Sequence, residues 1–495
     1  MSLLAFDIGS STCKAVVFAT TGEILAQHSF SYSPDSPRPA FAEMNPEKFW
    51  DAVCCCSQAV TKHLKEPVRA LGLSSHGETF VPVDSHGAPL SNAILNQDTR
   101  AIDESRWCEE AIGRQALFQI TGLFAHPMYP IPKILWLRKH ESRIFAASKS
   151  FVTVIGYLLQ RMGLPPFVDY SLASRFLAFD IRKRSWSDEI LHATELSRDS
   201  LPAPIPAGTI VGTLNADAAS QLGLSPGTPV VLGGHDQPCG ALGSGVIESG
   251  RVSDSLGTYE CLLAASDAPN LNPEALASSL NSYCHVVPER FVTLAYFPSG
   301  IMVQWFHDLL FPETNDKIDH YAYLEAHAPK GPTGLCVTPH LIGTCNPEFN
   351  PRARALIAGL SAGTNRAHIY KGILEGLACE LSIVAEVLAE AVGNFEDIYV
   401  TGGGTRSALG LELRAALTGC RLHVMKKQEA VSLGTAILAG VAVGECASIR
   451  EAVAALVDET AVVAPSPGLP TSYREQLNRY KELRSIAVTR AQGSS

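Results

Sequence analysis

The chain has 495 residues, 46% of them hydrophobic and 18% charged, and a formal net charge of −10 at pH 7. A single hydrophobic core stops growing at about 250 to 300 residues, so this length predicts two domains with a site in the cleft between them. The acidic balance disfavours nucleic acid or an anionic membrane as the main partner, because both need concentrated Lys and Arg.

The thirteen cysteines are scattered without a repeated spacing, which indicates reduced thiols rather than a disulfide framework. Cys54, Cys55 and Cys56 are consecutive, and on a helix their side chains point about 100° apart, so they cannot hold one metal ion together. The segment Met1 to Ile8 has no basic leader, and no stretch reaches the roughly 18 apolar residues of a membrane span. We therefore expect a cytoplasmic protein.

The first predicted elements form a three-strand meander, because apolar or β-branched runs are separated by turns rich in Gly and hydroxyl side chains. The strands predicted in this half are Leu3 to Ile8, Cys13 to Ala19, Ile24 to Ser31, Arg69 to Leu73 and Val230 to Leu232, and a helix is predicted at Pro46 to Leu64. The last of these strands ends in Gly233-Gly234-His235-Asp236-Gln237.

The second half again opens with strands joined by a small-hydroxyl turn, which hints at a duplicated architecture. Its predicted elements are strands at Arg251 to Ser255, from Tyr259, at Ile398 to Val400 and at Arg421 to Val424, and helices at Ser407 to Leu417 and from Val431. We place the domain boundary near Gly245, with domains at 1–245 and 246–460 and a tail at 461–495. Beyond Pro465 the tail is polar, and we expect it to be frayed.

Asp7 ends the first apolar strand, where an unpaired buried carboxylate would cost several kcal/mol. A magnesium ion, bound through water, would satisfy it; capping of its own turn is an equally good explanation of this segment alone. The hydroxyls and N–H groups of the next turn, with the charge of Lys14, could cradle a phosphate. Gly257-Thr258 is a second turn of this kind, and two such turns facing each other would grip adjacent phosphates.

Asp236 follows two glycines at a strand end and is the best catalytic candidate. With an ordinary pKa of about 3.9 it would hold a hydroxyl in line and accept its proton late, as a loose phosphoryl-transfer transition state permits. His235 is a rival base, but a His with no acidic residue to orient it more often packs or hydrogen-bonds. Gly402-x-Gly404-x-x-Ser407 lacks the third glycine of the dinucleotide fingerprint, so a dehydrogenase is disfavoured.

Taken together, the segments resemble the FGGY carbohydrate kinases, closest overall to the xylulokinase branch, from about Leu4 to Gly444. Each segment is weakly specific, but their order and spacing are highly specific. The matching segments are Asp7-Ile8-Gly9-Ser10-Ser11, Thr121-Gly122 to Pro132-Lys133 with Trp136, Asp169-Tyr170-Ser171 with Ala173-Ser174, Pro226-Gly227-Thr228-Pro229, Gly233-Gly234-His235-Asp236-Gln237, Ser255-Leu256-Gly257-Thr258, Arg366-Ala367-His368 with Glu375-Gly376, and Thr401-Gly402-Gly403-Gly404.

The resemblance implies two ribonuclease-H-like α/β domains of the actin and sugar kinase superfamily, which bind ATP, magnesium and a small sugar or polyol between them and close during turnover. It implies that Asp236 is the base and that Asp7 orders magnesium. The residues implied for phosphate and nucleotide are Ser10, Ser11, Thr12, Lys14, Gly257, Thr258, Gly300, Gln304, Gly403 and Ser407. A homodimer is possible.

The sugar site departs from the family pattern. Gly77-Glu78 stands where glycerol kinases have Arg-Glu and xylulokinases Met-His, Asn96 replaces a usual Trp before Gln97-Asp98, Met128 replaces the Tyr of glycerol kinases, and Gly343-Thr344-Cys345 replaces Gly-Glu-Arg. The residues predicted to contact substrate are Gly77, Glu78, Asn96, Asp98, Met128, Asp236 and Gln237. Taken alone, Glu78 and Asp98 would more often be solvated carboxylates. Because Asn adds hydrogen-bond capacity and Gly77 should open space, we expect a substrate at least as hydroxylated as xylulose.

The function predicted is therefore an ATP-dependent carbohydrate kinase, with a ketose such as xylulose as the first choice of acceptor. A non-catalytic sugar or nucleotide sensor, or an actin-like ATPase, is the alternative on the same fold. The presence of Asp236 disfavours the alternative, because a sensor would not need a base at that position.

Overall fold

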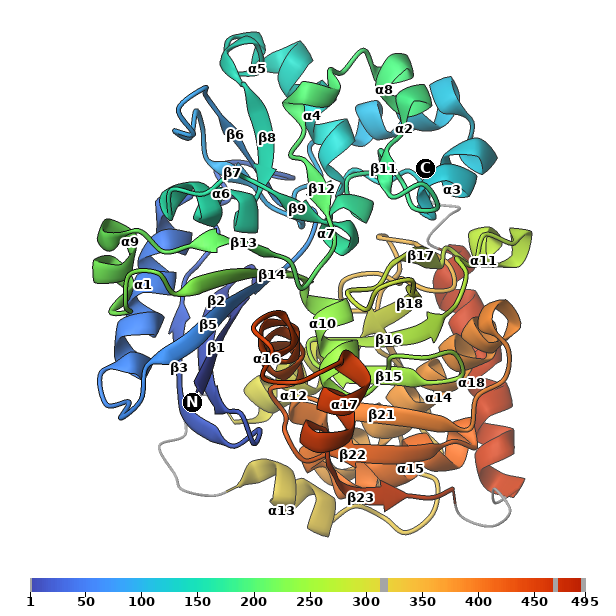
Figure 1. The fold of residues 1–495 in the computed structure, drawn as a ribbon. Helices are drawn as coiled ribbons and strands as arrows, with labels where there is room; N and C mark the ends of the chain where they lie inside the picture. Colours follow the sequence, from blue (N-terminus) through green and yellow to red (C-terminus); the bar gives the residue numbers. More distant parts are fainter. Residues whose placement is uncertain (1, 312–318, 466–470, 491–495) are drawn as a thin grey trace.

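The computed structural model describes residues 2–311, 319–465 and 471–490, which form two halves, each built on a sheet with helices against both of its faces (Figure 1). The first sheet has the strand order β13-β14-β5-β1-β2-β3. Its strands are β1 (Ser2–Ile8), β2 (Thr12–Ala19), β3 (Ile24–Ser31), β5 (Val68–Ser75), β13 (Ile210–Thr213) and β14 (Pro229–His235). The predicted meander is thus confirmed, and the predicted strand at Val230 to Leu232 is longer and reaches His235.

The second sheet has the order β17-β18-β16-β15-β21-β22-β23. Its strands are β15 (Val252–Leu256), β16 (Tyr259–Ser266), β17 (Asn281–Cys284), β18 (Phe291–Pro298), β21 (Asp397–Thr401), β22 (Arg421–Met425) and β23 (Glu459–Val463). In both sheets a first strand pairs antiparallel with a second, which pairs antiparallel with a third, while two later strands run parallel to the first. This repeated order is the duplicated ribonuclease-H-like architecture that the sequence predicts.

Smaller sheets and peripheral helices complete the two halves. The remaining strands are β4 (Glu43–Met44), β6 (Phe80–Val83), β7 (Ala93–Ile94), β8 (Ser150–Thr153), β9 (Val168–Asp169), β10 (Phe179–Asp180), β11 (Ser185–Trp186), β12 (Pro204–Ile205), β19 (Cys336–Thr338) and β20 (Leu356–Ala358). The helices of the first half are α1 (Glu47–Thr61), α2 (Ile102–Ile112), α3 (Arg114–Thr121), α4 (Pro130–His140), α5 (Ser142–Ala147), α6 (Val154–Arg161), α7 (Tyr170–Ser174), α8 (Asp188–Thr194), η1 (Arg198–Ser200), α9 (Ala216–Leu222) and α10 (Asp236–Gly243). Those of the second are α11 (Pro273–Ala277), α12 (Gly300–Leu310), α13 (His320–Ala326), α14 (Arg366–Val392), η2 (Gly403–Arg406), α15 (Ala408–Thr418), α16 (Ala430–Ala442), α17 (Ile449–Leu456) and α18 (Thr471–Arg490).

Helices α10 and α16 pack against each other between the two sheets, and each covers the sheet of the other half (Figure 1). Helix α10 follows the last strand of the first sheet but buries Ala241 against Leu263 of the second. Helix α16 follows the second sheet but buries Leu433 and Ala436 against Ala5 of the first. The chain changes sheets between β14 and β15, and the boundary near Gly245 stays a prediction, because α10 already packs on the second sheet.

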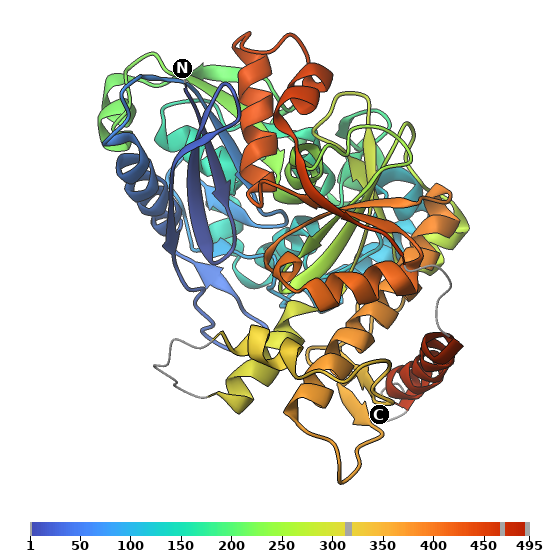
Figure 2. The same cartoon turned by 90° about the horizontal axis from the view of Figure 1, so that it is seen from below.

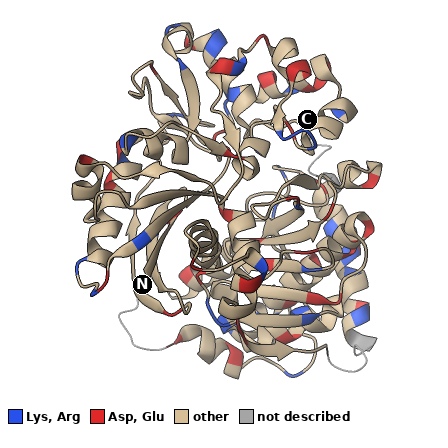
Figure 3. Ribbon diagram, in the orientation of Figure 1, with Lys and Arg blue, Asp and Glu red and all other residues tan. Residues whose placement is uncertain are grey.

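Acidic and basic residues are interspersed over the helices of both halves (Figure 3), and the chain carries a formal net charge of −10 at pH 7. Over the described ranges, no helix is both long and apolar enough to cross a bilayer. All thirteen cysteines are free thiols.

The expectation of a frayed tail beyond Pro465 is wrong for residues 471–490, which form the 20-residue helix α18 at the outer edge of the second half (Figure 2). Tyr480 is fully buried there and donates a hydrogen bond to Glu380 of α14 at 2.5 Å. The Arg484 guanidinium contacts both oxygens of Glu380 at 3.0 Å and Glu348 at 2.7 Å. A polar helix therefore docks through a buried ion pair, which its composition does not reveal.

We predict that Arg484→Met lowers the free energy of unfolding by about 2 kcal/mol, because Glu380 stays buried with one charged partner fewer. Lys481→Met is the matched control on the same helix, since its pair with Glu386 is exposed and should be worth about 0.5 kcal/mol or less. Urea unfolding of both variants measures the difference. Equal losses would show that α18 is not held by Arg484.

Candidate active site

Asp236 begins α10 directly after β14, and two glycines allow the strand to end there. A Cβ on Gly233 would lie 2.3 Å from the carbonyl oxygen of Leu73, and one on Gly234 would lie within 3.0 Å of Val286, Ser171 and Asp169. Ser171 also accepts a hydrogen bond from the backbone N–H of His235 at 2.9 Å. Only glycine can be accommodated at positions 233 and 234, because any side chain would collide with these neighbours. The same contacts hold the end of β14, and hence the backbone of Asp236, in place.

The Asp236 side chain is 21% exposed, and its Oδ1 accepts a hydrogen bond from the N–H of Gln237 at 2.6 Å. Burial, and then the negative charges of Asp7 and Glu78, raise the pKa of Asp236 well above its ordinary range. The carboxylate is thus a stronger base than the ordinary Asp assumed from sequence. Burial lowers the pKa of His235 to about 3, so this imidazole is neutral at pH 7; it lies 3.3 Å from Asp236.

Asp7 of β1 lies opposite Lys14 of β2 in their antiparallel pairing, and the turn predicted to hold phosphate joins these two strands. Burial raises the pKa of Asp7 to about 6; Lys14 opposes this rise and Glu429 adds to it. The Lys14 ammonium contacts the Glu429 carboxylate at 2.5 Å, so a residue at the start of α16 joins the phosphate turn from the other half of the chain. Nothing in the sequence alone indicated that Glu429 lies at this turn. The turn Ser10-Ser11-Thr12 closes through Gly9 N–H to the Thr12 carbonyl at 2.9 Å.

The donor chemistry at Asp7 fits magnesium, which prefers oxygen ligands and usually keeps several waters beside one or two carboxylates and a phosphate. Asp7 and Asp236 are near enough for the charge of one to raise the pKa of the other. Within the described ranges no group of three or more His, Cys, Asp or Glu side chains could hold a metal ion. The residues therefore suit an ion bound largely by water and nucleotide phosphate, not by a protein cage.

Gly77 does not open space, contrary to the sequence-based expectation. A Cβ there would lie 2.6 Å from Cδ2 and Nε2 of His235 and 3.3 Å from Cγ of Arg175. The room left by the missing side chain is already taken by the His235 ring. Gly77 therefore acts through the placement of His235, next to Asp236.

Glu78 is buried in a left-handed backbone conformation with φ of 60°, and it pairs with Arg175 Nε at 2.5 Å. Burial opposes the ionisation of Glu78, but the Arg175 charge and hydrogen bond, together with His235 and Lys133, lower its pKa below the ordinary value. Lys133 donates to the backbone carbonyls of Glu78 and Leu95 at 3.0 and 2.7 Å. Glu78 is therefore an ionised, fixed carboxylate and not a solvated one. Arg175 is a neighbour that sequence reasoning missed, although it directly follows the matched Ala173-Ser174.

The prediction that Asp98 contacts substrate is contradicted by its environment. Its carboxylate is fully buried, accepts from the Ala42 N–H at 2.7 Å and binds the Arg100 guanidinium at 2.7 to 3.0 Å. Both oxygens are thus used by the protein. The side-chain oxygen of Asn96 accepts from the Gln97 N–H, and the backbone N–H of Asn96 donates to the Thr79 hydroxyl, so Asn96 helps to shape this turn.

Met128 donates its backbone N–H to His126, which belongs to an aromatic group shared by the two halves. His126 and Phe124 of the first half lie 5.8 and 5.3 Å from the ring of Phe349, which also lies 5.7 Å from Tyr296. The Glu78 and Arg175 charges act on both His126 and Tyr296, so the group borders the predicted sugar side of the site. Sequence did not identify these aromatic residues as a group, because they come from three separate segments.

The second phosphate turn contacts the start of α12. Gly300 donates to the Gly257 carbonyl and Ser299 to the Thr258 carbonyl, both at 3.0 Å. A Cβ on Gly300 would lie 2.4 Å from the Gly257 oxygen, which explains a glycine at this helix start. Gln304, on the same helix, is exposed and donates to Asp308 at 2.9 Å.

Gly403 begins η2, and Ser407 caps α15 by accepting from the Gly410 N–H at 2.9 Å. Gln428, which sequence reasoning missed, accepts from the Gly402 N–H at 2.8 Å and so ties the glycine turn to the loop before α16. The predicted nucleotide residues of the second half thus lie at the ends of β15, α12 and β21.

Beneath these turns lies a buried charge cluster. Glu260 binds Arg414 through two hydrogen bonds of 2.9 and 2.7 Å and accepts a third from Ser299. Asp254 is fully buried on the same sheet face beside Glu260, and no N–H or O–H group of a described residue donates to its carboxylate oxygens. Burial and the charge of Glu260 raise the pKa of Asp254 well above its ordinary range.

We predict that Asp254→Asn raises the melting temperature at pH 8. The pKa of Asp254 is higher in the folded protein than the value of about 3.9 in the unfolded chain. Its contribution to the free energy of unfolding is therefore fully present below about pH 3.9 and is lost as the pH rises toward the pKa of the folded state. Asn cannot ionise, so the gain should shrink toward pH 4. Melting curves from pH 4 to 8 measure this; a gain independent of pH would contradict it.

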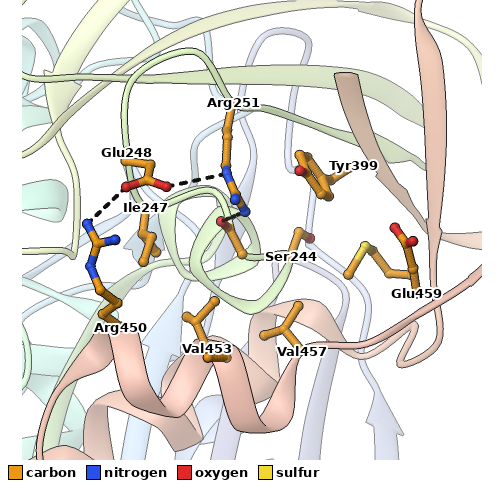
Figure 4. A pocket seen from close by; sticks show the side chains of 12 residues that line it. Ser244, Ile247, Glu248, Arg251, Tyr399, Arg450, Val453, Val457 and Glu459 are labelled. Atoms are coloured by element: carbon orange, nitrogen blue, oxygen red, sulfur yellow. Dashed lines mark hydrogen bonds and ion pairs between the residues drawn. The ribbon is translucent and has the colours of Figure 1, made fainter. Parts of the chain in front are cut away.

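Two surface cavities lie outside the residues predicted for substrate and nucleotide, although Gln428 and Glu429 line one of them. One of about 330 Å³ is lined by the end of α10, the start of β15 and α17, and its Arg251 and Arg450 both pair with Glu248 (Figure 4). Another of about 560 Å³ lies between the β2–β3 turn and residues 426–429. None of the residues predicted for substrate or nucleotide lines either cavity.

Comparison with known proteins shows that both halves match domain models of one protein family. The model of the N-terminal domain of the FGGY family of carbohydrate kinases matches residues 2–243, and the model of the C-terminal domain matches residues 252–443. Gluconokinase of Bacillus subtilis (strain 168) is 26% identical over 484 residues, which cover 95% of this chain and 93% of that protein. Xylulose kinase of Klebsiella pneumoniae is 30% identical over 445 residues, covering 89% and 90%.

Solved structures agree in fold. Gluconate kinase from Lactobacillus acidophilus superposes with a TM-score of 0.91 at 22% identity over 100% of this chain and 99% of that one. Ligand-bound xylulose kinase from the same organism gives a TM-score of 0.90 at 22% identity over 98% of each chain.

Proposed function

The chain belongs to the FGGY family of carbohydrate kinases, and we propose that it transfers the γ-phosphate of ATP to a hydroxyl of a neutral ketose such as xylulose. Kinases of this family use ATP and phosphorylate an alcohol group. The family membership predicted from sequence is thereby confirmed, and a sensor or an actin-like ATPase is disfavoured. A cytoplasmic location and a homodimer remain predictions.

The observation that carries the mechanism is the position of Asp236 at the start of α10, where burial and the charges of Asp7 and Glu78 raise its pKa. In our proposal this carboxylate accepts the proton of the attacking hydroxyl, and Gln237 fixes its orientation through the 2.6 Å hydrogen bond. In the same proposal, phosphate oxygens would be contacted from the two halves of the chain by Lys14, the Ser10-Ser11-Thr12 turn and the Gly257-Thr258 turn. Magnesium, when bound near Asp7, would neutralise charge on the transferring phosphate.

A neutral acceptor is favoured over a sugar acid by the charges around Asp236. Arg175 is the buried guanidinium beside this site, and its charge is already taken by Glu78. Lys133 is fully buried and bound to two carbonyls. A substrate carboxylate would instead meet the negative charges of Asp7, Glu78 and Asp236, which repel it.

ADP release from Mg-ATP tests this proposal with D-xylulose, D-gluconate and glycerol as acceptors. We expect the highest kcat/KM with the ketose. A clear preference for gluconate would overturn the neutral acceptor, and a preference for glycerol would overturn the requirement for a highly hydroxylated one. Neither result would affect the family membership.

A further inference from the structure

The hydroxyl of Tyr283 is a buried polar group without a partner. Tyr283 lies on β17, is fully buried, and its OH makes no hydrogen bond with any described residue. The other buried tyrosines of the described chain all donate: Tyr32 to Gly9, Tyr129 to Asn281, Tyr157 to Glu47, Tyr370 to Glu325 and Tyr480 to Glu380. An unpaired buried hydroxyl costs about 1–3 kcal/mol, so a Phe would be more stable at this position unless the hydroxyl has a use.

The Tyr283 ring contacts two neighbours of the predicted site. The His235 ring meets it edge-on with centroids 5.8 Å apart, and the Arg175 guanidinium lies 4.9 Å from its centroid. His235 precedes Asp236, and Arg175 holds Glu78. Burial chiefly, and the charges of Asp236 and Glu78 in addition, raise the pKa of Tyr283, so the phenol stays protonated and can donate.

Strand β17 is held against the first half and cannot shift to find Tyr283 another partner. The Ser282 N–H donates to the Gly122 carbonyl at 2.9 Å, and a Cβ on Gly122 would lie 1.8 Å from the Ser282 oxygen. Asn281 accepts from Tyr129 at 2.6 Å and from Arg175 at 3.1 Å. These contacts of its two chain neighbours hold Tyr283 beside the first half of the chain before any ligand binds.

We propose that the Tyr283 hydroxyl hydrogen-bonds a hydroxyl group of the sugar next to the one that Asp236 deprotonates, and that it thereby selects polyhydroxylated acceptors. The inference rests on the proposed function, because it places the acceptor beside Asp236. It adds a specificity residue from the second half of the chain to predicted substrate residues that all lie in the first half. Loss of this contact should weaken binding of the sugar and leave binding of ATP unchanged.

Tyr283→Phe tests the proposal, since it removes only the oxygen. We expect kcat/KM for the best sugar to fall about three- to tenfold, KM for ATP to stay within twofold, and the melting temperature to stay equal or rise. Tyr480→Phe is the matched control: its hydroxyl is bonded to Glu380 in α18, so it should lower the melting temperature and leave both KM values unchanged.

Deoxy analogues of the best sugar identify the contact. For the analogue that lacks the contacted hydroxyl, the parent and Tyr283→Phe should have equal kcat/KM, which a purely structural role would not produce. Unchanged kcat/KM of Tyr283→Phe with every sugar would overturn the inference alone, as would a lower melting temperature with an equal loss for all analogues. Absence of ADP release by the parent with every sugar would overturn the proposed function and the inference with it.

Discussion

Asp236→Asn should reduce kcat about 10²- to 10⁴-fold on the best sugar while KM for ATP changes little. The amide keeps the shape of the side chain but cannot take the proton of the attacking hydroxyl. Asp236 is suited to that task because burial and the charges of Asp7 and Glu78 raise its pKa. Steady-state ADP release gives kcat, and titration with ATP in the absence of sugar checks that nucleotide binding persists.

Asp188→Asn is the matched control for this experiment, because the Asp188 carboxylate is exposed and pairs with Arg198 on the surface at the start of α8. It should turn over like the parent. An Asp236→Asn enzyme with at least a tenth of the parental kcat would show that another group accepts the proton. His235 would then be the first residue to test, since its ring lies 3.3 Å from Asp236.

The places of the proposed base and of the proposed magnesium residue could be predicted from the sequence because both follow local rules. Asp7 and Asp236 each end an apolar strand and precede a turn or helix, and Gly233-Gly234 marks the place where the strand passes too close to its neighbours for a side chain. Such signals need only residues adjacent in the chain. The same applies to the Gly257-Thr258 turn.

The sugar side could not be predicted in this way, because its properties depend on partners far away in the chain. Glu78 and Asp98 look alike in sequence, yet Glu78 pairs with Arg175 near Asp236 while Asp98 is enclosed by Arg100 and Ala42. Gly77 is filled by His235, which lies more than 150 residues later. The docking of α18 could not be predicted for the same reason. The helix is polar in composition, and Arg484 is buried because it pairs with Glu380, about 100 residues earlier in the chain.

Gly434→Ala is expected to damage both stability and turnover, because α10 and α16 cross with their backbones in contact. A Cβ on Gly434 would lie 1.9 Å from the carbonyl oxygen of Cys239, and the reciprocal Cβ on Gly243 would lie 1.9 Å from that of Ala430. Backbone atoms cannot rotate away as a side chain does, so the two helices must separate. We expect a loss of about 3 kcal/mol in the free energy of unfolding, at the upper end for overpacking.

The same separation would move Asp236, since it is the first residue of α10, and displacement by about 1 Å can lower turnover 10²-fold. Gly240→Ala is the matched control, because Gly240 lies on α10 one turn before Gly243. A Cβ on Gly240 would meet a side-chain carbon of Val431 at 3.4 Å, which is an ordinary contact. That variant should be as stable as the parent or more so, because Ala favours a helix by about 1 kcal/mol over Gly. Urea unfolding and kcat of the two variants separate the effects. If Gly434→Ala matched Gly240→Ala in both, the close helix crossing would not be what holds Asp236 in place.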